Sequence, residues 1–558
     1  MLVKKRDGRL ENFDFNKMFK WEIWACRGIK DYIDWKGIIL DAYEDIKKEN
    51  NEVVDSQDIQ IKIINQALKR NTWYHQIVAG RLYAAYMMKK LFNGYYPKVK
   101  DLHEKLISLG LMRKLNYTDQ EYEEIDSIID HSKDFELSYF QLKQLYFKYA
   151  ICNKLTKEIY ESPQFIFMRM AMDLSEDETN KMEKVRKFYK YLSEFKISAP
   201  TPNYVNLGTN HRGYISCCLY TVSDSAKSLA IGDHIAYTMT YMSAGIGGFL
   251  NVRSINDPVK NGLIRHMGKI PYFKSVSSAV NANMQSSRGG ACTQYFMCYD
   301  PEVLDLIHLQ NPRTPLTKQI RDIHFAMQFN DYFVYKVLND EKIFTFNSYR
   351  APDLVEAFFS GNPSKFKEVY EKYENDPNFV KSYISAREIA FKALRQAHEV
   401  ATLYFINVDR VNMHTPFKDV IYQSNLCLEI VQPTKPYNEI TDLYSNEKHE
   451  RGEISLCALA AIVPSNIVDD NEYEECCYYA LLMIDKCIDK NEYVFPHLEY
   501  TAKARRNAGV GMIGIAYDLA KRNLKYSSEE GKRYIHYLAE RHAYYMLKAS
   551  LRLGKEKG

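Results

Sequence analysis

From about Lys196 onward, short apolar runs alternate with glycine-rich turns and with longer stretches of helical apolar spacing. The apolar runs are SCCLYTV (216–222), AGIGGFLNV (244–252), YFINV (404–408) and LCLEIV (426–431). Runs of this length are typical of strands, and strands that alternate with helices usually form a sheet or barrel covered by helices. We therefore expect an α/β fold here, in a chain whose 558 residues suffice for more than one domain.

The first 195 residues have a mostly helical pattern. LVKKRDGRLENF predicts a hairpin, with Asp7-Gly8 as its tight turn. Apolar residues recur at helical spacing from Ser56 to Arg70, and Ser56 is a suitable N-cap. Asn93-Gly94 and Pro97 punctuate the end of this first unit. We expect three domains, at 1–95, 96–215 and 216–558.

Two features near the C-terminus need an interpretation. From Glu529 onward, one face of a predicted amphipathic helix carries Ile535, Leu538, Ala539, Met546, Ala549 and Leu553. This face either docks on its own domain or is covered in part by a further polypeptide. Gly509, Gly511 and Gly514 form a GxGxxG pattern, but the preceding TAKARRNA is not a strand, so we expect close packing and no dinucleotide site.

Composition excludes several classes of function. The formal net charge is only +4, and no strong basic stripe indicates nucleic acid as the main partner. No apolar stretch reaches the roughly 18 residues of a membrane span. The N-terminus lacks the apolar core of a signal peptide, so we expect a cytoplasmic protein with reduced thiols. The 11 cysteines show no metal-ligand spacing, and each is a small buried hydrophobe unless its neighbours indicate otherwise.

The segment YQSNLCLEI, residues 422–430, is the most specific in the chain. If it is extended, Asn425, Cys427 and Glu429 share one face, about 7 Å apart in succession, and present an amide, a thiol and a carboxylate to a common ligand. The alternative is a strand whose polar residues face solvent.

These residues resemble the active-site finger loop of the large subunit of class I (aerobic) ribonucleotide reductases. Three further segments resemble the same family in the same order: APTPNYVNLGTNHRGYISCCL (199–219), SRGGA (287–291) and GEISLCALAA (452–461). The KRDG and FKISAPTP runs extend the match. The resemblance implies a mostly helical N-terminal ATP-cone and helical domain. An incomplete ten-stranded α/β barrel would follow, with the catalytic cysteine on an inner finger loop.

The resemblance also implies roles for individual residues. Cys427 would be the transient thiyl radical that takes the 3′ hydrogen of a ribonucleoside diphosphate, Glu429 the general base, and Asn425 a substrate-binding residue. Cys217 and Cys457 would supply two electrons and close to a disulfide. Cys218, one residue on, would point away; a register slip of one would exchange it with Cys217. Thr201 and Ser216 would contact substrate, although each residue type also caps turns.

Two regulatory nucleotide sites are implied as well. Asp224, Ser225, Arg253, Lys260 and Arg288 would bind or read a deoxynucleoside triphosphate that sets substrate preference. ATP or dATP would bind in the N-terminal unit, at Lys5, Arg6, Glu11, Asn12, Lys17, Ser56 and Lys89. Gln60 stands where the family often has His, which puts inhibition by dATP in question. For these cations the alternative is a solvated surface.

The implied holoenzyme has several components. The large subunits would form a dimer and work with a small subunit whose metal cofactor generates the radical, with a thioredoxin- or glutaredoxin-type reductant; no cofactor would be bound covalently. The family's later elements, including a tyrosine pair and a C-terminal cysteine pair, are not recognised here. We therefore expect a truncated or split protein that needs a complementary C-terminal chain, in the cytoplasm of a host if it is phage-encoded. The alternatives are an adenosylcobalamin-dependent reductase and a non-catalytic nucleotide-sensing fragment.

Overall fold

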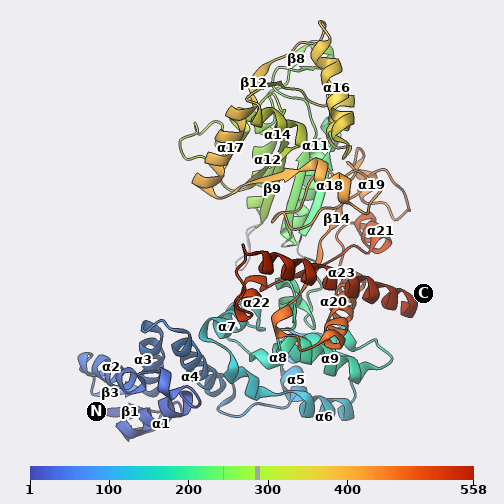
Figure 1. Ribbon diagram of the computed structural model, residues 1–558. Helices are drawn as coiled ribbons and strands as arrows, with labels where there is room; N and C mark the ends of the chain where they lie inside the picture. Colours follow the sequence, from blue (N-terminus) through green and yellow to red (C-terminus); the bar gives the residue numbers. More distant parts are fainter. Residues whose placement is uncertain (216, 243, 283–289, 558) are drawn as a thin grey trace. The chain divides into compact units, whose positions relative to one another are not determined.

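The computed structural model describes residues 1–215, 217–242, 244–282 and 290–557 (Figure 1). The chain forms two compact units. Unit one comprises Met1–Arg212, Ala460–Met483 and Val510–Gly558, and unit two comprises Gly213–Leu459 and Ile484–Gly509. No helix in the described ranges is long and apolar enough to cross a membrane.

Unit one begins with the predicted hairpin. Strands β1 (Leu2–Lys4) and β2 (Leu10–Asn12) pair antiparallel, and β3 (Val53–Asp55) joins β1 in parallel. Around this sheet lie α1 (Phe15–Ala25), α2 (Trp35–Lys48), α3 (Ser56–Lys69) and α4 (Trp73–Phe92). The α3 helix begins at Ser56, but Asp55 is the cap and accepts from the Gln57 N–H, so the predicted Ser56 cap is wrong by one residue. Asn93 ends α4 in the left-handed conformation.

The rest of unit one is mostly helical, as expected. Its core is α8 (Pro163–Ser175), which is buried along its whole length. The Arg169 guanidinium on α8 pairs with the buried Glu161 carboxylate at 2.7 Å and donates to the Tyr204 carbonyl at 3.0 Å. The short helix α10 (Thr201–Asn206) is thereby held against α8. Further helices of this part are α5 (Val99–Ser108), α6 (Asp119–Ile128), α7 (Tyr139–Gln144) and α9 (Lys181–Ser193).

The last helix, α23 (Glu529–Lys557), docks on its own unit. It packs on the first part of α20 (Asp470–Lys490), where the His542 Nδ1 and Tyr473 hydroxyl lie 3.0 Å apart and Arg552 pairs with Glu475 at 2.9 Å. The predicted apolar face is partly right, because Leu538, Ala549 and Leu553 are buried, whereas Ala539 is exposed. Nearby lies α22 (Ile515–Lys521), which follows β16 (Ala508–Met512).

Unit two is built on a six-stranded sheet of order β13-β10-β9-β6-β5-β14. Strands β5 (Cys217–Val222), β6 (Gly245–Leu250), β9 (Ala291–Met297), β10 (His324–Phe329) and β13 (Leu403–Asn407) run parallel. Strand β14 (Ser455–Leu456) is antiparallel to β5. Among the helices between strands are α11 (Ala226–Tyr241), α12 (Ile270–Asn281), α14 (Asp331–Leu338) and α17 (Ala386–Val400). The α/β prediction is confirmed, with six of the expected ten strands in the described part of this sheet.

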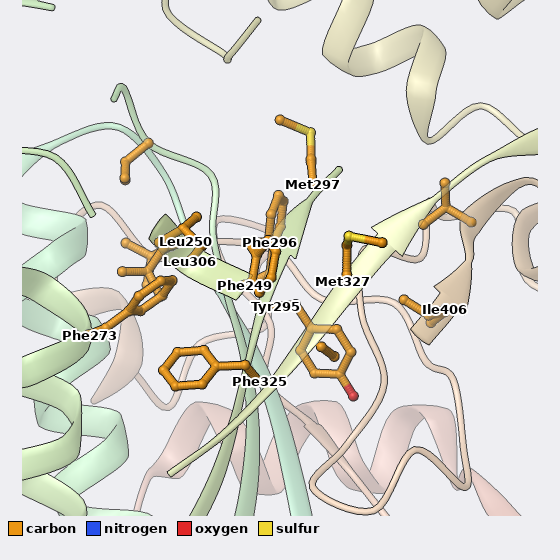
Figure 2. Close-up of a cluster of buried hydrophobic side chains, with 14 of the residues drawn as sticks. Phe249, Leu250, Phe273, Tyr295, Phe296, Met297, Leu306, Phe325, Met327 and Ile406 are labelled. Carbon is orange, nitrogen blue, oxygen red and sulfur yellow. The ribbon is translucent and has the colours of Figure 1, made fainter. Parts of the chain in front are cut away.

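The core of unit two lies on this sheet. Phe249 of β6, Phe296 of β9, and Phe325 and Met327 of β10 are all buried in one apolar cluster (Figure 2). Strands of a parallel sheet are covered on both faces and are therefore almost continuously apolar. The polar residues of the candidate site consequently lie mostly outside the strands, on the loops between them.

Candidate active site and nucleotide sites

Residues 424–431 form a tight loop. Ser424 and Val431 pair in an antiparallel bridge, and Leu428 takes a positive φ of 60°. The segment is therefore not extended, and the shared face expected for an extended segment does not form. The buried Asn425 Oδ1 accepts from the N–H groups of Glu429 at 3.1 Å and Ile430 at 3.3 Å. These local side-chain bonds replace the inter-strand bonds of an extended backbone.

Strand β6 provides the seat for this loop. A Cβ on Gly247 would lie 2.2 Å from the Ser424 carbonyl oxygen, so only glycine permits this approach of the loop backbone. A Cβ on Gly245 would lie 2.4 Å from the Leu426 side chain. From β9, the Thr293 hydroxyl donates to the Leu426 carbonyl and the Tyr295 hydroxyl to the Asn425 carbonyl, each at 2.7 Å. Sequence reasoning missed these residues, although repeated glycines inside a strand indicate close backbone approach.

The three residues expected to share a face differ in their exposure to solvent. Cys427 and Glu429 are exposed, whereas Asn425 is fully buried. The Asn425 amide nitrogen has no hydrogen-bond partner among the described residues. Tyr404 of β13 lies close by: burial raises the pKa of its hydroxyl, and Cys427 and Glu429 raise it further. The loop thus presents a thiol and a carboxylate outward from a rigid base.

A pair of buried thiols lies beneath the loop. Cys217 begins β5, Cys457 directly follows β14, and the Cys457 N–H donates to the Cys217 carbonyl at 3.0 Å. Both cluster with Leu426 of the loop, whereas Cys218 faces the main core on the opposite side of the sheet. Burial raises the pKa of Cys457 well above its ordinary value, and a hydrogen bond with the Cys217 thiol raises it further. The two thiols are therefore adjacent, and the Cys457 thiol is held in the protonated form.

Asp224, Ser225 and Arg253 form a polar corner just after the C-terminal end of β5. Arg253 forms an ion pair with Asp224 at 2.9 Å and also donates its backbone N–H to that carboxylate at 3.2 Å. Ser225 caps α11 by accepting from the Ser228 N–H at 3.1 Å. Lys260 is exposed near the hairpin of β7 (Pro258–Val259) and β8 (Ile264–Arg265). Arg288 and Ser216, predicted for effector and substrate, lie outside the described residues.

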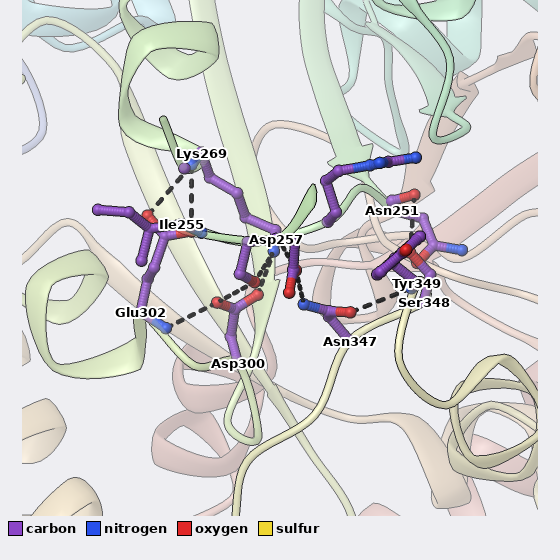
Figure 3. Close-up of polar contacts among 12 residues, drawn as sticks. Asn251, Ile255, Asp257, Lys269, Asp300, Glu302, Asn347, Ser348 and Tyr349 are labelled. Atoms are coloured by element: carbon purple, nitrogen blue, oxygen red, sulfur yellow. Dashed lines mark hydrogen bonds and ion pairs between the residues drawn. The ribbon is translucent and has the colours of Figure 1, made fainter. Parts of the chain in front are cut away.

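A buried polar network supports this corner (Figure 3). Lys269 forms an ion pair with Asp300 and donates to the Ser254 hydroxyl at 3.1 Å. Glu302 accepts from the N–H groups of Ile255 and Lys269, and burial raises its pKa to about 7. Sequence reasoning missed this network because its members are far apart in the chain. Its effect is to hold the segment after Arg253 in place.

A cavity of about 950 Å³ opens in the N-terminal part of unit one. Its size falls in the range of small-molecule sites. Six of the seven predicted residues line it, namely Lys5, Arg6, Glu11, Lys17, Ser56 and Lys89, whereas Asn12 does not. The Arg6 guanidinium donates to the Gln60 amide oxygen at 3.1 Å. Burial lowers the pKa values of Arg6 and Lys89. Trp21 and Arg9 also line the cavity and were not predicted.

The last predicted residue, Thr201, begins α10 in unit one, and its hydroxyl lies 3.5 Å from that of Tyr149.

Gly509 of the GxGxxG pattern lies within β16, where a Cβ would come 2.8 Å from Leu459, in agreement with the expected close packing. Within the described ranges, no group of three or more His, Cys, Asp or Glu residues is arranged to hold a metal ion.

Comparison with known sequences places this architecture in a family. Residues 215–558 match the ribonucleotide reductase barrel domain, residues 135–212 the ribonucleotide reductase all-alpha domain, and residues 1–89 the ATP cone domain. The chain therefore belongs to the ribonucleotide reductase family, as a large-subunit chain of the class I type, and is an oxidoreductase.

The relatives make the assignment more specific. The chain is 34% identical to the ribonucleoside-diphosphate reductase subunit alpha of Buchnera aphidicola (subsp. Schizaphis graminum), over 100% of this chain and 73% of the relative. It is 32% identical to subunit alpha of reductase 1 from Escherichia coli K12 (100% and 74%) and to that of Enterobacteria phage T4 (100% and 73%). About a quarter of each relative thus has no counterpart in this sequence.

Proposed function

We propose that this chain reduces ribonucleoside diphosphates to 2′-deoxyribonucleoside diphosphates by radical chemistry at Cys427. The observation that carries the proposal is the position of the exposed Cys427 thiol, next to Leu426, which packs against the buried thiols of Cys217 and Cys457. A thiol suits the role because an S–H bond is weak and re-forms easily. A buried thiol pair can deliver two electrons by forming a disulfide.

The proposed steps balance as follows. The Cys427 thiyl radical takes the hydrogen atom from C3′, and the Glu429 carboxylate takes the proton of the 3′ hydroxyl. The 2′ hydroxyl leaves as water after receiving a proton from the Cys217–Cys457 pair. That pair supplies two electrons, delivers its second hydrogen to C2′ and becomes a disulfide. Glu429 returns its proton to the 3′ oxygen, and Cys427 returns the hydrogen atom to C3′ and becomes the thiyl radical again. The Asn425 amide nitrogen lacks a partner among the described residues, and we assign it a hydrogen bond to the substrate. Thr201 and Ser216 are further substrate contacts in the proposal.

Two nucleotides would regulate the reaction. The N-terminal cavity, with its basic residues and Trp21, suits ATP or dATP. The corner formed by Asp224, Ser225 and Arg253, together with Lys260 and Arg288, would receive the deoxynucleoside triphosphate that sets substrate preference. Because Arg253 already pairs with Asp224, a triphosphate there would have to share or replace that ion pair. The division into domains at 1–95, 96–215 and 216–558 stays part of this proposal.

The working enzyme would contain more than this chain. We assign it a second copy of itself, a radical-generating small subunit with a metal cofactor, and a thioredoxin- or glutaredoxin-type reductant. Since about a quarter of each relative has no counterpart here, we propose that polypeptide equivalent to that quarter is also required.

The test is reconstitution. The purified chain is assayed for deoxynucleoside diphosphate formation with a class I small subunit, reductant and ATP, with and without a polypeptide equivalent to the missing quarter. We expect turnover only in the complete mixture, and a higher thermal midpoint for the chain when the polypeptide binds its folded form. Full turnover without that polypeptide would refute the requirement, and no turnover in any mixture would refute the function.

A further inference from the structure

Buried hydrogen bonds join the two ends of the catalytic loop to each other and to β5. Gln423, directly before the loop, accepts from the Thr221 hydroxyl at 3.1 Å and donates to the Thr434 hydroxyl at 3.1 Å. The Thr221 and Thr434 hydroxyls lie 2.5 Å apart. These three side chains, which we name the clasp, are 0%, 6% and 2% exposed for Gln423, Thr221 and Thr434.

A second contact lies farther along the segment that follows the catalytic loop. Asn438, four residues after Thr434, accepts from the Ser223 hydroxyl at 2.8 Å and from the Ser225 hydroxyl at 3.4 Å. Ser225 belongs to the polar corner proposed for the effector. The segment from Val431 to Asn438 therefore begins at the catalytic loop, passes the clasp and ends at the corner.

The clasp is the buried part of this route, whereas the contacts of Asn438 lie at the exposed corner, where a ligand group can reach them. A buried network strengthens its own members, and breaking one bond leaves its partners desolvated and unpaired. The Ser225–Asn438 bond is the longest in the route, and the Ser225 hydroxyl already accepts from the Ser228 N–H. A ligand group that competes for Ser225 would leave Asn438 bonded to Ser223 alone and let it shift, while the clasp keeps the segment in register with β5.

We propose that the clasp positions the catalytic loop, and that Asn438 couples the loop to occupancy of the polar corner. Gln423, Thr434 and Thr221 are positioning residues, since they touch the loop's supports and not the reacting atoms. The coupling rests on the proposed function of the corner. All of its residues belong to the part of the chain that the structure describes, and residues 283–289 are not among them.

Hydrogen exchange of the peptide that spans 424–431 tests the proposal without turnover. Thr434→Val keeps the shape of the side chain but removes the hydroxyl, and exchange of the Glu429 and Ile430 amides should become about tenfold faster. Thr434→Ser should restore the wild-type rate. Thr501→Val is the matched control, because that buried hydroxyl donates to the carbonyls of Ile454 and Leu498 and is not part of the clasp. Unchanged exchange in Thr434→Val, or equal acceleration in Thr501→Val, would overturn the clasp.

Thymidine triphosphate is the probe for the coupling. In the wild-type chain it should change the exchange rate of the 424–431 peptide at least twofold, and in Asn438→Ala it should leave that rate unchanged while still binding.

The reconstituted enzyme should show a kcat about tenfold lower in Thr434→Val at nearly constant KM, with recovery in Thr434→Ser. A wild-type response to the probe that persists in Asn438→Ala, or a wild-type chain that binds the probe without any response, would overturn the coupling. If the wild-type enzyme shows no turnover, the proposed function fails, and the exchange measurements still decide the clasp.

Discussion

Replacing Gly247 by alanine should displace the catalytic loop while leaving its chemistry intact. The added Cβ would lie 2.2 Å from the Ser424 carbonyl oxygen and 2.8 Å from the Asn425 Cα, whereas ordinary contact begins near 3.4 Å. The gap to the oxygen must therefore widen by about 1.2 Å (3.4 − 2.2). Gly247 pairs with Leu219 of β5 and Thr293 of β9, so its strand is fixed on both sides and the loop has to move.

The magnitude follows from these distances. Overpacking of this kind costs about 1–3 kcal/mol of stability. A shift of about 1 Å in a reacting group can reduce turnover about 100-fold. We therefore expect Gly247→Ala to fold and to lose about two orders of magnitude in kcat in the reconstituted reductase assay.

Gly511→Ala is the control for this experiment. Gly511 also lies in a strand, but a Cβ there would meet nothing within 4 Å, so both turnover and the thermal midpoint should stay at the wild-type values. Wild-type turnover in Gly247→Ala would show that the loop's seat on β6 does not set the position of Cys427.

Three further predictions concern other parts of the chain. After one turnover without reductant, mass spectrometric mapping should find a disulfide between Cys217 and Cys457, and a bond that includes Cys218 would refute the assigned register. Arg6→Met should weaken ATP binding about tenfold or more by removing a charge-assisted contact, measured by tryptophan fluorescence, since all four tryptophans lie within residues 21–73; unchanged affinity would exclude the N-terminal cavity as the site. Burial raises the pKa of Glu22 from 4.5 to about 8, so this group's favourable contribution is full below pH 4.5 and is lost as the pH rises through 8. Glu22→Gln should remove that part of the decline in the fluorescence-detected thermal midpoint, and an identical decline in the variant would contradict it.

Much of the fold could be predicted from the sequence because its signals are local. Asp7-Gly8 is enough to specify a hairpin turn, and the apolar spacing after Ser56 is enough to specify a helix. The apolar runs at 216–222, 244–252 and 404–408 become β5, β6 and β13 because a strand buried on both faces needs continuous apolar sequence.

The site could be predicted only in part. The run at 426–431 is as apolar as the strands, but the Asn425 side chain bonds to the backbone within the loop and prevents an extended conformation. The seat on Gly245 and Gly247, the clasp and the Lys269–Asp300 pair depend on contacts between residues far apart in the chain. The repeated glycines indicate that some backbone approaches closely, but no local pattern identifies the distant partner, so the geometry of the loop required the structure.

The central claim is that Cys427 carries the radical chemistry, and turnover of Cys427→Ser in the complete reconstituted mixture tests it most directly. Serine preserves the size of the side chain but cannot form a comparable radical. We predict no deoxynucleoside diphosphate above background, with ribonucleoside diphosphate binding close to that of the wild type. Cys152→Ser, at a half-buried cysteine outside the site, should keep wild-type turnover. Measurable product from Cys427→Ser would contradict the account.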